Sequence, residues 1–396
     1  GIGGRNAATG ANCPTLVAQP KAAVPKNVFC YVENWAQWRK MDARPDNWAA
    51  VTGPEMDASH CTHVVWAFGD VCTPTPDSAY PQRYSMTASR CTGKQLGEAV
   101  FFEEADAENI AASMKSWRKQ NPDIKILWSV GGWYFGPQRL SEIMNNTVPD
   151  PPTQTGHSKT LHAQSSNARA NFVASVAKIV QEFDFDGFDW DWEYPGTGCL
   201  GDDGATWRAP VPTTPAPTPA GTCAPPAPTP THDPHNCPTD FINQDRANFG
   251  ATIDALHDEF AKITLLGSGL HPTQHIAVHA FRWHNYPIEH LRNASKIATV
   301  GLMSYDLAGA WSSCAAGNSP LYPDSSCTPG QDGVDHRTWD ADAYSIHGAL
   351  DVWSRGDPSL TGTALYAQNT SSSAGPAIPK AQLHGGVAFY GRYGRT

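Results

Sequence analysis

Residues 183–195 read FDFDGFDWDWEYP and place four acids within eight residues, among large apolar side chains. The acids are Asp186, Asp189, Asp191 and Glu193. Because side chains alternate between the two faces of an extended strand, Asp189, Asp191 and Glu193 share one face. The aromatic residues between them point to the other face, which we expect to be buried. The three acids then line an interior surface or a cleft.

The alternative interpretation of this stretch is an ordinary half-exposed strand with a solvated acidic face. It fits poorly, because neighbouring carboxylates repel each other and lose solvation when they are partly buried. A fold retains such a cluster mainly where the acids share protons or take part in chemistry. An aspartic protease also uses paired acids, but its two carboxyls come from separate lobes rather than from one strand.

The composition limits the class of protein. The chain has 396 residues, a net charge of −10 and 17% charged residues, which indicates an acidic soluble protein. It has no basic patch or arginine-rich run, so nucleic acid is not expected as a partner. No apolar run approaches the ~20 residues of a membrane span, so no membrane association is expected. Fourteen Trp, twelve Tyr and fourteen Phe exceed what a core needs and suit a carbohydrate site, because apolar sugar faces stack on rings.

The cysteines and sequons indicate secretion. Ten cysteines, an even number, predict disulfides and an oxidising compartment. As nearest neighbours we pair Cys72 with Cys91 and Cys314 with Cys327. No Cys-x2-Cys pair occurs, which argues against a zinc site. Three N-glycosylation sequons agree with a secreted, extracellular protein. They begin at Asn145, Asn293 and Asn369.

Two segments differ from the rest of the chain. Residues 1–26 are rich in Gly, Ala, Asn and Pro, and we expect a flexible leader. Residues 209–237 consist mainly of Pro, Thr and Ala, which predicts a low-complexity insertion with polyproline character. Elsewhere, predicted strands alternate with helical stretches, as in a parallel sheet. Strands are expected at 27–32, 63–68, 124–130, 183–195, 262–267, 297–305 and 384–390, and helices at 98–119, 166–182, 241–261 and 340–354.

Polar and aromatic residues follow the carboxyl ends of several predicted strands. They are Glu33-Asn34-Trp35, Gly131-Gly132-Trp133, Glu193-Tyr194, Tyr305-Asp306 and Tyr390. In a (β/α)8 barrel the active site is built at that end, so we expect these side chains to converge. Carboxylates beside aromatic rings suit glycoside cleavage, in which one acid donates a proton and its neighbours stabilise a cationic sugar.

The segment from Asp186 to Pro195 resembles the DGxDxDxEYP signature of glycoside hydrolase family 18, the chitinases. Six further stretches resemble the same family in the same order. They are Cys30-Tyr31 with Asn34-Trp35-Ala36-Gln37, Cys61-Thr62-His63 leading to Ala67-Phe68, Ser129-Val130-Gly131-Gly132-Trp133, Met303-Ser304-Tyr305-Asp306, Asn318-Ser319-Pro320-Leu321-Tyr322 and Phe389-Tyr390-Gly391-Arg392.

The resemblance covers residues 27–396 and implies an α/β fold, the (β/α)8 TIM barrel. A barrel without its eighth strand keeps open edges and an incomplete core, and the chain stops just past the predicted seventh strand. We therefore expect residues 27–396 to form a partial catalytic barrel, from which the family's eighth strand and insertion domain are missing.

The resemblance also implies an activity, that of a secreted chitinase. Such an enzyme hydrolyses β-1,4-linked N-acetylglucosamine polymers with retention, and the nucleophile is the substrate's own N-acetyl oxygen. Glu193 would be the general acid and then the base that activates water. Asp191 would orient the acetamido group and share a proton with Asp189, and close carboxylates titrate as a unit. Tyr305 would hydrogen-bond the acetyl carbonyl.

The other matching positions would bind the substrate, which is chitin or a chitooligosaccharide. They are Tyr31, Trp35, Trp133, Asp186, Tyr194, Met303, Asp306, Tyr390 and Arg392. Cys30 and Cys61 would form a disulfide between the first two strands. The protein would act as a monomer without a cofactor. Other interpretations place Trp35 and Trp133 in the core, Tyr31 among packed strand residues and Tyr305 inside the barrel as a filler.

Three alternatives stay open. A chitinase-like lectin would bind chitin or oligosaccharides without catalysis, although the presence of Glu193 and all three aspartates favours an enzyme. An endo-β-N-acetylglucosaminidase would act on N-glycans, although the aromatic strand ends favour a linear polymer. Finally, His271, His275 and His279 stand four residues apart and suggest a metal. Pro272 disfavours one helix there, so we expect loop histidines and no metal site.

Overall fold

The computed structural model describes most of the segment that carries the predicted strands. The described residues are 27–35, 56–72, 89–102, 105–145, 167–197, 239–280, 285–308, 317–322, 345–355, 377–388 and 390. The predicted leader (1–26) and the predicted insertion (209–237) lie outside them, so both stay predictions.

Within the described residues, seven parallel strands form one curled sheet of the TIM-barrel class, in the order β1-β2-β4-β5-β6-β7-β8. These strands are β1 (Phe29–Glu33), β2 (His63–Val71), β4 (Lys125–Gly131), β5 (Gly187–Asp191), β6 (Thr273–His279), β7 (Thr299–Met303) and β8 (Leu383–Gly385). An additional short strand, β3 (Ala99–Phe101), pairs antiparallel with the end of β2.

The curl brings the two edge strands of this sheet toward each other. The ring of Phe29 in β1 lies 5.1 Å from the ring of His384 in β8, between centroids. It also lies 5.7 Å from the ring of His275 in β6. In the described sheet order these strands are not neighbours of β1, so the contacts cross the interior. The carboxyl ends of all seven strands therefore face the same end of a half-barrel.

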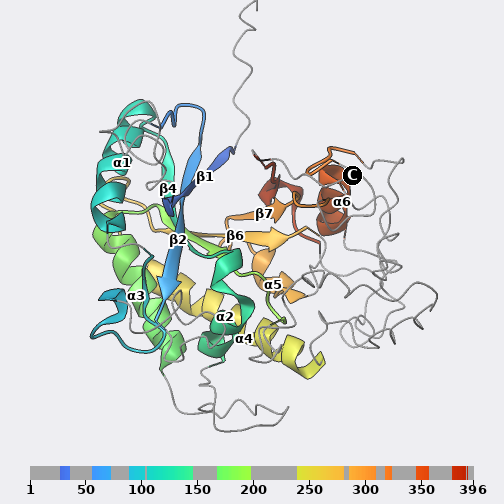
Figure 1. Cartoon of the computed structure of the whole chain (residues 1–396), viewed down its shortest axis with the longest axis horizontal. Helices are drawn as coiled ribbons and strands as arrows, with labels where there is room; N and C mark the ends of the chain where they lie inside the picture. Colours follow the sequence, from blue (N-terminus) through green and yellow to red (C-terminus); the bar gives the residue numbers. More distant parts are fainter. Residues whose placement is uncertain are drawn as a thin grey trace, which may run out of the picture.

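Helices surround the sheet on its outer side (Figure 1). They are α1 (Asp106–Gln120), α2 (Pro137–Met144), α3 (Ala168–Phe183), α4 (Thr239–Phe260), α5 (Ile288–Leu291) and α6 (Ile346–Arg355), with 3-10 turns at Ser89–Cys91, Trp133–Phe135 and Lys380–Gln382. The outward aromatic face of β5 packs against them. Trp190 lies 5.5 Å from Phe172 of α3 and 5.2 Å from Phe249 of α4, between ring centroids. Within the described ranges, no helix has the length and apolarity that a membrane span needs.

Two disulfides fix the first part of the barrel. Cys30 of β1 is bonded to Cys61, just before β2, and Cys72, just after β2, is bonded to Cys91. Both predicted pairings are confirmed. The predicted pair of Cys314 and Cys327 lies outside the described residues.

The predicted strand at 262–267 is wrong. That segment forms turns after α4, and Leu266 is 94% exposed. The strand of this region is β6, where we expected loop histidines. Its buried residues include Gln274 and His275, so the apolar run of this buried strand is only Ile276-Ala277-Val278. Both polar groups are paired: Gln274 accepts a 2.9 Å hydrogen bond from Trp190 Nε1, and His275 Nδ1 lies 2.7 Å from Thr299 Oγ1.

The other boundaries differ less. The predicted helix at 98–119 begins too early, because Ala99–Phe101 pair with the end of β2 and the helix starts at Asp106. The last strand is shorter than predicted and covers Leu383–Gly385. The remaining predicted strands and helices correspond to observed elements within a few residues, and residues 340–344 of the last predicted helix lie outside the described residues.

Candidate active site

The three acids of the alternating pattern lie together at the carboxyl end of β5. Asp189 and Asp191 are in the strand and are 2% and 5% exposed, and Glu193 follows two residues after it with partial exposure. Trp190 and Trp192 are buried on the outer face, 1% and 0% exposed. The alternation predicted from the sequence is therefore confirmed, with the acids toward the barrel interior.

Asp189 is held by two hydroxyl groups from other strands. Its Oδ2 accepts a 2.7 Å hydrogen bond from Ser129 Oγ of β4 and a 3.1 Å hydrogen bond from the Tyr31 hydroxyl of β1. Burial raises the pKa of Asp189 to about 7, although both hydrogen bonds lower it by favouring the charged form. The Tyr31 contact spans the curl of the sheet, because β1 and β5 are not neighbours.

The pKa values of Asp191 and Glu193 are also raised, which favours the protonated form of each carboxyl group. Burial raises the pKa of Asp191 well above its usual value, and the charges of Glu193 and Asp189 add to the effect. Burial raises the pKa of Glu193 to about 7, opposed by a hydrogen bond from Tyr194 and assisted by the charge of Asp306. The carboxyl group of Asp191 keeps one buried oxygen, Oδ1, that has no hydrogen-bond partner among the described residues. This end of the sheet therefore retains protons on carboxyls into the neutral range.

Tyr305 and Asp306 follow β7 on the same end of the sheet. Burial raises the pKa of Tyr305 well above 10, and the charges of Asp191 and Glu193 raise it further, so the hydroxyl stays a proton donor. Asp306 accepts a 2.8 Å hydrogen bond from the Tyr390 hydroxyl at its Oδ2. The backbone N–H of Asp306 donates to Oδ1 of Asn318 at 2.8 Å.

Four of the predicted binding residues present large exposed rings. Tyr31 is 44% exposed, Trp35 37%, Trp133 49% and Tyr390 48%. The interpretation of Trp35 and Trp133 as core residues is therefore wrong. Met303 ends β7 and is partly buried. Arg392 lies outside the described residues, so its role stays a prediction.

The structure does not bring Asp186 to this group. Asp186 precedes β5 and lies at its amino end, seven positions before Glu193. Its carboxylate is 3.2 Å from Lys125 Nζ and 3.4 Å from an Arg118 guanidinium nitrogen, and it accepts a 2.9 Å hydrogen bond from the backbone N–H of Ile126. Asp186 thus anchors the start of the strand, and the prediction that it contacts substrate has no support in this geometry.

Two residues of this end were not named as functional from the sequence. Ser129 holds Asp189, and its signal was present in the quoted Ser129–Trp133 stretch. His279 ends β6, and its ring stands perpendicular to the Tyr194 ring at 4.8 Å. From the sequence it is considered only as a metal ligand or a loop histidine, because β6 is not predicted as a strand. No group of three or more His, Cys, Asp or Glu residues within the described ranges is arranged to hold a metal ion.

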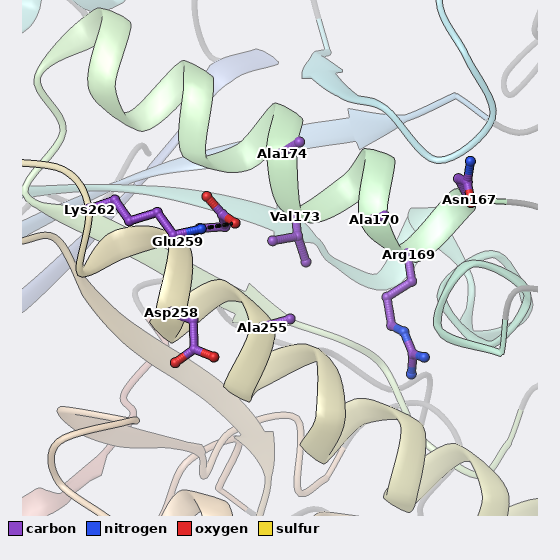
Figure 2. A pocket seen from close by; sticks show the side chains of 9 residues that line it. All are labelled: Asn167, Arg169, Ala170, Val173, Ala174, Ala255, Asp258, Glu259 and Lys262. Carbon is purple, nitrogen blue, oxygen red and sulfur yellow. Dashed lines mark hydrogen bonds and ion pairs between the residues drawn. The ribbon is translucent and has the colours of Figure 1, made fainter.

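A separate hollow of about 460 Å³ lies on the outer side, between α3 and α4 (Figure 2). It is lined by Asn167, Arg169, Ala170, Val173, Ala174, Ala255, Asp258, Glu259 and Lys262. The lining includes none of the acids or tyrosines at the carboxyl end of the sheet. Lys262 and Glu259 pair with each other at 2.6 Å.

A curled parallel sheet with acids, tyrosine hydroxyls and exposed rings at its carboxyl end defines a TIM-barrel protein of the glycoside hydrolase class. The chain belongs to the glycosyl hydrolases family 18, whose model matches residues 27–396.

Proteins named as chitinases resemble this chain at low sequence identity. An endochitinase of Manduca sexta is 23% identical over 354 residues, covering 88% of this chain and 46% of the relative. A solved structure of a Trichuris suis chitinase superposes with a TM-score of 0.51 at 19% identity, covering 90% of this chain and 64% of that chain. A Group IV chitinase of Ostrinia furnacalis in complex with allosamidin gives 0.50 at 20% identity, covering 92% and 66%. The chain therefore spans about half to two thirds of the length of these relatives.

Proposed function

We propose that this protein is a secreted chitinase that hydrolyses β-1,4-linked N-acetylglucosamine polymers with retention, by a substrate-assisted mechanism. Family membership supports the substrate class, because the Manduca sexta relative bears the name endochitinase. Two disulfides among the described residues support an oxidising compartment.

The observation that carries the proposal is the buried Oδ1 of Asp191, which has no hydrogen-bond donor among the described residues. An unpaired buried carboxyl oxygen is costly, so the site gains when a ligand brings a donor. The N–H of an acetamido group is such a donor. Asp191 lies between Asp189 and Glu193 in the alternating pattern, so a sugar that gives its N–H to Asp191 lies beside the proton of Glu193.

The proposed reaction follows from these roles. Glu193, with a pKa near 7, gives its proton to the glycosidic oxygen as the bond to the anomeric carbon breaks. The acetamido carbonyl oxygen of the same sugar attacks that carbon, which forms an oxazolinium ion, while Asp191 accepts the N–H. Tyr305 donates a hydrogen bond to the carbonyl oxygen. The Glu193 carboxylate then removes a proton from the water that opens the oxazolinium ion, so the β configuration is retained.

The exposed rings suit a linear substrate. Trp35, Trp133 and Tyr390 each present more than a third of their surface to solvent at the end of the sheet where the acids lie. Rings in such positions offer flat apolar surfaces to the sugars on either side of the cleaved bond. This distribution favours chitin and chitooligosaccharides over a branched N-glycan core.

The test compares release of a fluorophore from chitobiose and chitotriose glycosides by the wild type and by Glu193→Gln. We expect the variant to lose nearly all turnover and to keep oligosaccharide binding. Asp186→Asn is the matched control, because it changes an acid of the same stretch at the other end of β5, and it should keep its turnover.

Each result separates the candidate functions. Equal rates in the wild type and Glu193→Gln would refute the role of Glu193. Binding of chitooligosaccharides by a wild type that releases no fluorophore would identify a lectin. Release of intact N-glycans from a glycoprotein, without cleavage of chitooligosaccharides, would identify an endo-β-N-acetylglucosaminidase.

A further inference from the structure

The loop that carries Glu193 is fastened to two helices behind it. Before Glu193, the indole Nε1 of Trp192 donates a 3.1 Å hydrogen bond to the carbonyl oxygen of Pro137, at the start of α2. After Glu193, the backbone N–H of Gly196 donates a 2.9 Å hydrogen bond to Oδ2 of Asp245 in α4. The position of Glu193 is thus set by one attachment on each side.

Asp245 is a fully buried acid, 0% exposed, with three donors from two separate segments, α2 and the loop after Glu193. Its Oδ2 accepts the Gly196 N–H and a 2.7 Å hydrogen bond from Ser141 Oγ of α2. Its Oδ1 accepts a 3.0 Å hydrogen bond from Asn145 Nδ2, at the end of α2. Burial raises the pKa of Asp245, and these three hydrogen bonds oppose the rise. Burying a carboxyl is expensive, and here the same group joins α2, α4 and the loop of Glu193.

The polar contacts continue from Asp245 to the outer surface. Asn145 Oδ1 accepts a hydrogen bond from Asn248 Nδ2, and Asn248 Oδ1 accepts one from an Arg169 guanidinium nitrogen at 3.3 Å. Arg169 lines the outer hollow between α3 and α4 (Figure 2). Because both amides in this chain of contacts can rotate by half a turn, a neutral amide at position 245 could be accommodated. The hydrogen bond that is lost would then be the one between Arg169 and Asn248, at the surface.

We propose that Asp245 is a positioning residue for catalysis: by accepting the Gly196 N–H it holds the Glu193 carboxyl in its partly buried place at the carboxyl end of β5. This inference rests on the proposed function of Glu193. Gly196 adopts a φ of +73°, and a Cβ at that position would lie 3.1 Å from Ile242 of α4, so the loop sits tightly on this helix. Without the acceptor, the loop is free to move away from α4 and to expose the partly buried Glu193 to more water.

The experiment measures turnover and, separately, the pKa of Glu193 by NMR of ¹³C-labelled glutamate carboxyls, with Glu193→Gln identifying the signal. In Asp245→Ala we expect the pKa of Glu193 to fall from about 7 toward its usual value of 4.5. We expect kcat to fall by about 100-fold, as for a misplaced catalytic group, with little change in KM. Asp245→Asn should restore most of both properties, because its amide oxygen can still accept the Gly196 N–H.

Two further variants serve as a control and as a second test of the positioning role. Asp254→Asn also replaces an aspartate of α4 by asparagine, at a carboxylate paired with Lys296. This variant should behave like the wild type. Ser141→Ala removes one donor to Asp245 and should lower kcat and the pKa of Glu193 in the same direction, by less. This variant replaces Asp245→Ala if melting temperature or near-ultraviolet circular dichroism shows that the alanine variant does not fold.

The outcomes distinguish this inference from the proposed function. If the wild type is active and Asp245→Ala leaves both the pKa of Glu193 and kcat unchanged, the positioning role is overturned and the proposed function stands. If Asp245→Ala does not fold, the same result in Ser141→Ala has the same meaning. A wild type that cleaves no chitooligosaccharide, combined with a lowered Glu193 pKa in the variant, refutes the function and supports the positioning.

Discussion

Asp189→Asn should make the folded protein more stable at neutral and alkaline pH. Asp189 is 2% exposed and accepts hydrogen bonds from Ser129 and Tyr31 at a single oxygen, Oδ2. An asparagine side chain of nearly the same shape can accept both hydrogen bonds with its amide oxygen. The asparagine side chain carries no charge, so the free-energy cost of a buried carboxylate at position 189 disappears. We predict the size of that free energy.

The magnitude follows from the pKa of Asp189. It rises from 3.8 to about 7 in the folded protein, mainly through burial. At 1.36 kcal/mol per pKa unit, this rise corresponds to about 4 kcal/mol. Between these two pH values the folded state binds more protons than the unfolded state. The contribution of Asp189 to the free energy of unfolding is therefore full below pH 3.8 and is lost as the pH rises through about 7.

The assay is urea unfolding of the wild type and Asp189→Asn at several pH values from 3.5 to 8. Relative to the wild type, the variant should gain about 4 kcal/mol between the ends of this range. The measurement at pH 3.5 is the internal control, because Asp189 is then protonated in the folded state and mostly protonated in the unfolded state. A difference between the two proteins that stays constant with pH, or that changes in the opposite direction, would refute the reasoning.

Three other changes test neighbouring parts of the site and barrel. Tyr305→Phe removes one hydroxyl donor and should lower kcat on a chitotriose glycoside by about 100-fold; an unchanged kcat would exclude its contact with the reacting carbonyl. Trp133→Ala removes a ring that is 49% exposed, and calorimetry with chitooligosaccharides should show a binding loss of at least about 1 kcal/mol at an unchanged melting temperature. Lost stability with unchanged binding would instead make Trp133 structural. Burial lowers the pKa of His275 to about 3 from 6.5, so the unfolded state binds more protons between these values and stability falls as the pH falls through this window. His275→Gln should flatten this loss in urea unfolding at acid pH, and equal acid slopes would contradict it.

The sequence predicted best where local pattern and physical cause coincide. The strict alternation from Asp189 to Glu193 requires acids on one face and aromatic rings on the other, and only an inner and an outer layer satisfy both. The helix at 166–182 is predicted because Phe172, Val176 and Ile179 recur at helical spacing, and α3 confirms it. The disulfide of Cys72 and Cys91 followed from their proximity in the chain.

The sequence failed where a residue's role depends on distant partners. Strand β6 buries Gln274 on its outer face and His275 on its inner face, and their partners Trp190 and Thr299 come from other strands, so no local pattern shows that they are paired. Asp186 belongs to the acidic stretch, but an extended strand rises about 3.3 Å per residue, which places it up to about 23 Å from Glu193, seven positions later.

Asp245 shows the same limit within the site. Nothing in its helix distinguishes it from a solvated acid, because its donors come from Ser141, Asn145 and Gly196, at least 49 positions away. Only the folded chain brings these groups to one carboxylate.

The most direct test of the central account is the configuration of the first product released from chitotetraose, followed by proton NMR before mutarotation. Substrate-assisted hydrolysis by Glu193 and Asp191 predicts the β-anomer as the initial product. An initial α-anomer would contradict it, because water would then have attacked the anomeric carbon directly, without the acetamido group as nucleophile.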